Sequence, residues 1–336
     1  MGAGSRRALI TGVTGQDGSY LAEQLLQRGV EVFGLVLAGE AVPGHLPAAV
    51  RLIPGTLADQ RSLEAALREA RPEHVYNLGA ATSVAGSFAD PVAAADVTGL
   101  GVLRLLEAVR RVSPSTRLLQ ASSSEIFAGA GTSPQDERTP LSPRSPYGAA
   151  KAFAHQMVSV YRRAHHLFAA TVILYNHESP RRGLGFVTRK VSDGAARIAL
   201  GLARELPLGT LDVERDWGWA PDYVRAMRLA LEADVPDDYV VATGEAHSLR
   251  ELLDVAFSAA GLDWRAHVVS DPALRRPAEP ALLVGDAGRA RARLGWAPTR
   301  SFGEVIREMV AADLARLGGS PEPPSPTPVA RPAAPE

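Results

Sequence analysis

Tyr147 and Lys151 have the residue types and the spacing that most clearly suggest chemistry in this sequence. Four positions apart on a helix, their side chains would lie one above the other on one face. The phenol of a free tyrosine has a pKa of about 10 and is a poor base at neutral pH. A neighbouring ammonium favours the phenolate, so we expect a lowered pKa for Tyr147 and a role in proton transfer. An ordinary surface Tyr/Lys pair would show the same spacing, and the pair therefore needs support elsewhere in the chain.

Hydroxyl and carboxylate groups follow the apolar run 117–121, upstream of that pair. In an extended segment the side chains of Ser123 and Glu125 point to the same side. Parallel α/β sheets bind ligands at this end of their strands. Tyr147 would then serve as the base that oxidises a hydroxyl, and Glu125 would supply a second, separate base. The alternative for Glu125 is a loop carboxylate, or one that starts a helix.

A glycine-rich turn with Gly12, Gly15 and Gly18 lies between the apolar run 7–11 and the first helical run. Glycines let a backbone turn tightly and approach a pyrophosphate, and the N-terminus of the following helix attracts anions. The spacing differs from the ordinary Gly-x-Gly-x-x-Gly pattern, and such a turn can be purely structural. Its place between a strand and a helix favours a dinucleotide, and an oxidised nicotinamide would add positive charge beside Tyr147.

Alternating strand-like and helix-like runs must position these groups. The expected strands are 7–11, 30–37, 51–54, 74–78, 117–121, 169–175 and 238–242. The expected helices are 19–28, 60–70, 97–112, 147–163, 222–233, 249–260 and 302–317. This alternation predicts an α/β fold, a Rossmann-type doubly wound parallel sheet with a smaller mixed C-terminal lobe, to which the family resemblance given below assigns substrate binding.

The predicted domains follow from the order of these runs. We assign residues 1–176 to an NAD(P)-binding Rossmann domain, with 218–244 returning to it. Residues 177–217 and 245–317 form the predicted substrate-binding lobe. The Pro-rich stretch 318–336 has few large apolar residues, so we expect it to be disordered.

Composition excludes several classes of function. The chain has 336 residues with 36 Lys and Arg against 37 Asp and Glu, a net charge of −1. A net charge this close to zero gives no sign of a basic surface that would bind nucleic acid or an anionic membrane. The sequence has no cysteine, which excludes disulfides and thiolate chemistry, and we expect no metal site. No signal peptide or membrane-length apolar stretch is recognisable, so we expect a soluble, cytoplasmic protein.

The glycine spacing, Ser123 and Tyr-x-x-x-Lys resemble the extended short-chain dehydrogenase/reductase superfamily. Longer segments are similar to the GDP-mannose 4,6-dehydratases, and the resemblance continues to about residue 317. These segments are 8–22, 120–127, 145–151, 176–183, 187–190, 211–218 and 242–248. The segment Asn-His-Glu-Ser-Pro-Arg-Arg-Gly at 176–183 is the most specific, because general superfamily members lack it.

The resemblance implies a hydro-lyase that makes a 4-keto-6-deoxy sugar nucleotide. Tyr147 would take the proton of the sugar 4-hydroxyl while hydride leaves C4, with Ser123 hydrogen-bonded to that oxygen. Glu125 would remove the C5 proton and protonate the departing C6 hydroxyl, and the hydride would return to C6. The NADP or NAD cofactor would be tightly bound and regenerated in place.

The family's binding residues carry over onto matching positions. Cofactor binding is implied for Gly12, Thr14, Gly15, Gln16, Asp17, Gly18, Leu57 and Leu78, together with Tyr147 and Lys151. Substrate binding is implied for Ser124, Asn176, Lys190, Arg215, Arg276 and Glu279. Arginines suit a diphosphate, although any one of them alone could be a surface charge. We expect His177 to be structural, and the helices 97–112 and 147–163 could pair two or four subunits as in the superfamily.

The sequence departs from the family after the second strand. Leu37 and Ala38 stand where the family has a basic pair that holds the 2′-phosphate of NADP and helps join tetramers. We therefore expect NAD to bind at least as well as NADP. The alternatives to the family's activity are another nucleotide-sugar dehydratase, a 4-epimerase, or a non-catalytic cofactor-binding protein. An epimerase needs no C5 base, so Glu125 argues against that alternative.

Overall fold

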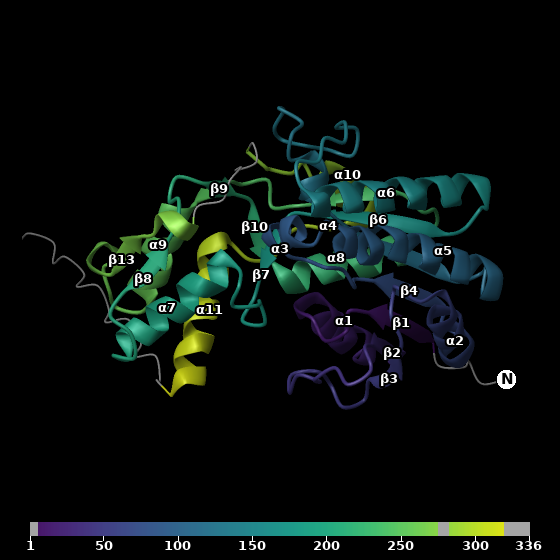
Figure 1. The fold of residues 1–336 in the computed structure, drawn as a ribbon, viewed down its shortest axis with the longest axis horizontal. Helices are drawn as coiled ribbons and strands as arrows, with labels where there is room; N and C mark the ends of the chain where they lie inside the picture. The colour runs from purple at the N-terminus through teal and green to yellow at the C-terminus, as the bar shows by residue number, and fades with distance from the viewer. Residues whose placement is uncertain (1–5, 275–281, 319–336) are drawn as a thin grey trace, which may run out of the picture.

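The large sheet of the protein contains seven parallel strands. The computed structural model describes residues 6–274 and 282–318. The strand order is β11-β6-β5-β4-β1-β2-β3, with every neighbouring pair parallel (Figure 1). The bounds are β1 (Arg7–Thr11), β2 (Glu31–Val36), β3 (Arg51–Pro54), β4 (His74–Asn77), β5 (Arg117–Ser123), β6 (Ala169–Leu174) and β11 (Asp238–Val241). The direction of winding reverses between β1 and β4, which opens a crevice at the carboxyl ends of these strands.

Helices cover both faces of this sheet. They are α1 (Gln16–Leu26), α2 (Gln60–Ala70), α3 (Val84–Ala89), α4 (Pro91–Ala94), α5 (Gly101–Val112), α6 (Pro146–Ala164) and α8 (Ala220–Glu232). Ala8 and Ile10 of β1 belong to one apolar core with residues of α1 and α8. Leu9 belongs to the opposite core with residues of α2, α5 and α6. Because successive strand residues alternate faces, both sides of the sheet are buried, as a doubly wound fold requires.

A third apolar core lies to one side of the sheet. It joins residues of α7 (Val187–Ala199), α9 (Leu249–Ala259) and α11 (Phe302–Leu317), which Figure 1 shows together at the left. Short strands accompany it: β7 (Asn176–Glu178), β8 (Leu206–Leu208), β9 (Glu214–Arg215), β10 (Trp217–Trp219), β12 (His247–Ser248) and β13 (Val268–Ser270). By contrast, α10 (Gly288–Leu294) packs on β11 and α8, and Trp296 belongs to a core of the large sheet.

The predicted fold class is confirmed, and all seven expected strands occur in the sheet. The starts of two helices differ most from the prediction. Helix α1 begins at Gln16 rather than Ser19, because the extended Gly15 serves as its N-cap. The expected helix 97–112 splits into a π-helical segment, Ala95–Leu100, and α5.

Helix α7 has no counterpart among the predicted elements. Its polar residue Arg189 is buried, with an ion pair to the fully buried Asp313 of α11. Buried charges interrupt the apolar periodicity by which an amphipathic helix is recognised. Residues 319–336, for which we expected disorder, lie outside the described part of the chain.

Candidate active site

The pocket that contains the predicted catalytic residues lies where β4, β5 and β6 end, facing β7 and β9. Its volume is about 330 Å³. It is lined by Asp17, Leu78, Thr82, Ser83, Val84, Ala85, Ala121, Ser122, Ser123, Glu125, Tyr147, Lys151, Leu174, Tyr175, Asn176, His177, Arg182, Gly185, Phe186 and Arg215. The structure therefore brings all four predicted catalytic residues together, and it adds two of the predicted substrate-binding residues, Asn176 and Arg215.

Local structure explains how Ser123 and Glu125 come to face Tyr147. Ser123 ends β5, and its hydroxyl caps the 3-10 turn Ser124–Phe127 by accepting a hydrogen bond from the Glu125 backbone N–H at 3.3 Å. The strand therefore passes directly into a turn that carries the carboxylate. Pro146 begins α6 and Ser145 caps it, so Tyr147 lies in the first turn of the helix, beside the pocket.

Tyr147 is a weaker acid in this structure than its neighbours in sequence suggest. Burial raises the pKa of Tyr147 to about 12, opposed by its hydrogen bond with Ser123, while the charge of Glu125 raises it further. A phenolate loses its hydration in this pocket, which outweighs the favourable contacts with the chain's own residues. Our expectation of a lowered pKa included the charge of an oxidised nicotinamide, and it stays a prediction for the protein with cofactor bound.

Lys151 is buried beneath Tyr147. Its Nζ lies 5.7 Å from the centroid of the Tyr147 ring and donates a hydrogen bond to the carbonyl of Ala121 at 2.7 Å. Burial lowers the pKa of Lys151 to about 8, and the charge of Asp17 opposes that change. The carbonyl of β5 thus fixes the ammonium at the sheet edge, close to the phenol.

The glycine turn fits a dinucleotide. Gly12 has a φ of +70°, and a Cβ there would lie 2.8 Å from the backbone nitrogen of Gly79. No side chain of the described residues caps the N-terminus of α1 at Gly15. Its first N–H groups can therefore face a pyrophosphate. A second pocket of about 360 Å³ adjoins the turn and is lined by the predicted residues Gly12, Thr14, Gly15, Leu57 and Leu78, with Glu40 among the others.

Asp17 connects this turn to β7. Its carboxylate lies 2.8 Å from Nε2 of His177, whose Nδ1 lies 2.7 Å from the carbonyl of Tyr175. A carbonyl and a carboxylate both accept, so each ring nitrogen must donate and the imidazole is positively charged. Burial alone would lower the pKa of His177, but the charge and hydrogen bond of Asp17 raise it above its ordinary value. Burial likewise opposes ionisation of Asp17, yet contact with His177 leaves the pKa of Asp17 lowered overall.

Arg182 is a cation of the pocket that sequence reasoning did not select. Its Nε lies 3.3 Å from the carboxylate of Glu178, and its guanidinium lies 3.5 Å from the centroid of the Phe186 ring. The residue belongs to the segment 176–183 that carries the family resemblance, so the segment itself was the available signal. Its charge lowers the pKa of both Asp17 and Tyr147, although burial is the larger influence on each.

Arg215 lies where two pockets meet. Its side chain lines the catalytic pocket and also a neighbouring pocket of about 390 Å³, bounded by residues 210–215, Ser248, Arg250 and Leu282. An Nη of Arg215 donates to the Glu214 carbonyl at 2.7 Å. This position would suit a diphosphate that extends from one pocket to the next.

The remaining predicted residues lie elsewhere. Nζ of Lys190 donates to the carbonyl of Pro207 at 2.6 Å, and Lys190 is not among the residues that line the catalytic pocket. Ser124 is buried in the turn beside the pocket. Gln16 connects α1 to β7 through the carbonyl of His177 and the hydroxyl of Ser179. Arg276 and Glu279 lie outside the described residues.

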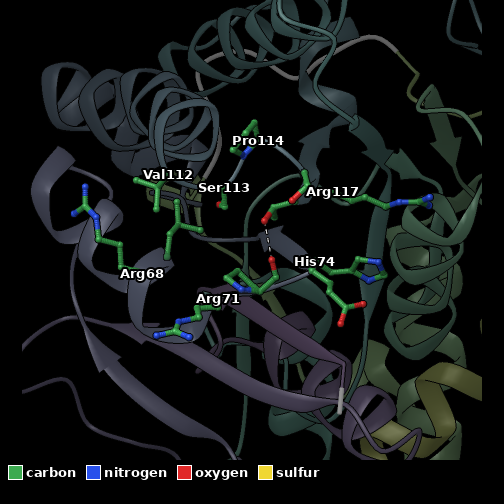
Figure 2. Close-up of a pocket in the computed structure, with 12 residues that line it drawn as sticks. Arg68, Arg71, His74, Val112, Ser113, Pro114 and Arg117 are labelled. Carbon is green, nitrogen blue, oxygen red and sulfur yellow. Dashed lines mark hydrogen bonds between the residues drawn. The ribbon is translucent and has the colours of Figure 1, made fainter. Parts of the chain in front are cut away.

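A larger pocket lies at the opposite edge of the sheet and is lined by none of these residues. Figure 2 shows this pocket of about 840 Å³, which includes the starts of β4 and β5. Its Arg117 points to the carbonyls of Leu231 and Ala233, and its Arg68 pairs with Glu64. Size alone therefore does not locate the chemistry in this molecule.

The described residues also bear on metals and membranes. Among residues 6–274 and 282–318, no cluster of three or more His, Cys, Asp or Glu side chains is arranged to hold a metal ion. Within the same ranges, no helix has the length and apolar character needed to span a membrane.

The sheet and the Ser/Glu/Tyr/Lys set are those of a short-chain dehydrogenase/reductase. Two similar solved structures agree. UDP-glucose 4-epimerase of Thermus thermophilus, in complex with NAD, is 32% identical with a TM-score of 0.81, covering 91% of this chain and 98% of that chain. A putative epimerase from Burkholderia cenocepacia is 28% identical with a TM-score of 0.81, covering 93% of this chain and 99% of that chain.

Sequence comparison identifies the particular family. The profile described as GDP-mannose 4,6 dehydratase matches residues 9–309. GDP-mannose 4,6 dehydratase 1 of Arabidopsis thaliana is 46% identical, covering 91% of this chain and 89% of the relative. The human GDP-mannose 4,6 dehydratase is 43% identical, covering 96% of this chain and 95% of the relative. The chain belongs to the GDP-mannose 4,6-dehydratase family.

Proposed function

We propose that this chain converts GDP-mannose to GDP-4-keto-6-deoxymannose by losing water between C5 and C6. The observation that carries the proposal is the meeting of Ser123, Glu125, Tyr147 and Lys151 in one pocket. Two bases are needed, because oxidation at C4 and elimination across C5 and C6 remove different protons. Family membership indicates GDP-mannose as the substrate, and the pocket contains both bases.

The chain's own residues divide the proton transfers between them. Tyr147 accepts the proton of the 4-hydroxyl, with Ser123 hydrogen-bonded to the same oxygen. The resulting 4-keto group acidifies the C5 proton, which Glu125 removes and passes to the departing C6 hydroxyl. A bound nicotinamide dinucleotide would accept the C4 hydride and return it to C6, while C5 takes up a proton in place of the one it lost, which balances the proton that Tyr147 took from the 4-hydroxyl. Lys151 holds positive charge beneath Tyr147, where it favours the phenolate.

The residues around the glycine turn support a nicotinamide dinucleotide as the cofactor. Gly12 permits the close turn, and the N-terminus of α1 faces the place of the pyrophosphate. Leu57 and Leu78 line the adjoining pocket and offer apolar surface to an adenine. Since Leu37 and Ala38 supply no cation for a 2′-phosphate, NAD binds at least as well as NADP.

For the substrate, we assign the sugar to the catalytic pocket and the diphosphate to Arg215. Asn176 and Arg182 line the same pocket opposite Tyr147 and offer donors to sugar and phosphate oxygens. The neighbouring pocket beyond Arg215 is then the place for the base. The three helices of the third core form the substrate-binding lobe in this proposal.

Incubation of the protein with GDP-mannose and NAD or NADP tests the proposed function. We expect a product lighter by one water that carries a keto group, with no net reduction of the added cofactor. Mass spectrometry with trapping of the ketone by hydroxylamine measures both features, and UDP-glucose serves as the control substrate. A product of unchanged mass would favour a 4-epimerase, an alternative suggested by the solved epimerase structures.

A further inference from the structure

The loop after β2 carries Glu40, whose carboxylate turns back toward the pocket beside the glycine turn. The backbone N–H of Glu40 donates to the carbonyl of Leu37 at 3.0 Å, closing a tight turn. Gly39 takes a φ of +79° in this turn, a conformation that glycine adopts readily. Oε2 of Glu40 then accepts the backbone N–H of Leu37 at 2.9 Å. The side chain, although exposed, is therefore folded back over the end of β2.

The other carboxylate oxygen reaches the glycine turn. Oε1 of Glu40 accepts a hydrogen bond from the hydroxyl of Thr14 at 2.5 Å. Thr14 and Glu40 come from different loops, so this bond joins two loops that line the same pocket. Both oxygens are thus oriented by the protein before any ligand binds, which reduces the entropy cost of using them.

The charge in this pocket is of one sign. Among the described residues that line it, Glu40 is ionisable at neutral pH and no Lys, Arg or His is present. A ribose 2′-hydroxyl can donate to a carboxylate. A 2′-phosphate would bring a charge of about −1.5 to −2 beside Glu40, with no cation in the lining to offset it. In Rossmann folds, an acidic residue that follows the second strand commonly accepts a hydrogen bond from the ribose 2′-hydroxyl, and Glu40 follows the second strand here.

We infer that Glu40 selects NAD over NADP in this chain by accepting a hydrogen bond from the adenosine 2′-hydroxyl. The inference rests on the proposed function only in that the pocket holds a nicotinamide dinucleotide. Loss of the basic pair at Leu37 and Ala38 removes attraction for the 2′-phosphate, whereas Glu40 adds repulsion and a partner for the hydroxyl. Together, these two differences make the protein prefer NAD, instead of binding NAD and NADP equally well.

Isothermal titration of the purified full chain with NAD and with NADP tests this role. We expect wild-type protein to bind NAD at least about tenfold more tightly, the size of one charge-assisted hydrogen bond. Glu40→Gln keeps the side-chain shape but loses the charge, and should reduce that ratio to about threefold or less. Adenosine 5′-phosphate and adenosine 2′,5′-bisphosphate, which differ by the 2′-phosphate alone, should show the same change in ratio.

Glu69→Gln is the matched control, because Glu69 is an exposed carboxylate of α2 that does not line the pocket. It should retain the wild-type ratio. Thr14→Val removes the partner of Oε1 and gives a second variant, expected to weaken the preference, if Glu40→Gln fails to fold. A wild-type protein that binds NADP as tightly as NAD, or an unchanged ratio in Glu40→Gln, would overturn the role of Glu40 but not the proposed function. Absence of binding by either dinucleotide would overturn the proposed function as well.

Discussion

Tyr147 must lose a proton in surroundings that disfavour its charged form. Burial and the nearby Glu125 hold the pKa of Tyr147 at about 12, while Ser123 and Arg182 oppose them. In the proposed reaction, Glu125 therefore disfavours the first step, the ionisation of Tyr147, and serves the second, the removal of the C5 proton. The two demands fit steps taken in sequence, since the C5 proton of the substrate would become acidic only after C4 has been oxidised.

The two bases are separable by substitution. Tyr147→Phe should lower formation of the 4-keto product by at least about a hundredfold, because no base remains for the 4-hydroxyl. Glu125→Gln should still reduce bound cofactor when GDP-mannose is added, yet lose dehydration to a similar degree. Single-turnover absorbance of the reduced nicotinamide, compared with the mass of the product, distinguishes the two variants. Normal dehydration by Glu125→Gln would require a different base.

At the scale of elements, the cofactor turn and β7 are joined by an ion pair. Asp17 lies in the first turn of α1, and His177 lies in β7, which pairs with β10 and precedes the third core. Gln16 and Ser179 add a second bond between the same elements. The glycine turn and the segment that begins with β7 are thus held together by contacts between residues far apart in sequence.

This pair should make stability depend on pH. Because the folded protein raises the pKa of His177, its contribution is fully present below the unfolded value of about 6.5 and is lost as pH rises through the folded value. Asp17→Asn should remove that contribution. The difference in melting temperature between wild type and Asp17→Asn should therefore shrink from pH 6 toward pH 9, measured without cofactor. A difference that grows with pH would contradict a charged His177.

At the scale of the whole molecule, apolar side chains gather on one exposed face of the large sheet's helices. Phe153 and Val160 of α6 are 39% and 37% exposed, Leu100 is 43% exposed, and Val92 of α4 is 76% exposed. Helix α6 packs against both α4 and the π-helical segment, so these residues belong to adjoining elements. We propose that this face pairs two copies of the chain.

The apolar face gives an oligomeric prediction. Wild-type protein should have the mass of a dimer at micromolar concentration, because this face would lose its contact with water in the pair. Phe153→Lys should shift the mass toward the monomer. Val235→Lys is the matched control, since Val235 is 62% exposed and follows α8, away from these helices. Light scattering coupled to size exclusion measures each mass, and a monomeric wild type would refute the pairing.

Local spacing in the sequence determined which residues are proposed to carry the chemistry. Ser123 ends β5 and Glu125 lies in the 3-10 turn that follows it, while Tyr147 and Lys151 lie on one helix turn, so each pair is a local arrangement. The alternation of strands and helices then determined the fold class, because a parallel sheet is what such alternation builds. The beginnings of α1 and α5 and the whole of α7 were not predicted, since caps, π-helical turns and buried ion pairs depend on packed neighbours.

Tertiary structure alone decided what surrounds those groups. Burial raised the pKa of Tyr147 against the expectation from its sequence neighbours, because desolvation is a property of the packed pocket. Packing also brought Arg182 and the Asp17–His177 pair to the same pocket from distant segments. The turn at Gly39 returned Glu40 to Thr14 across 26 positions, a contact that no local pattern reveals. The sequence thus determined the reacting groups, and the fold decided their charges and their partners, because both depend on which segments exclude water from one another.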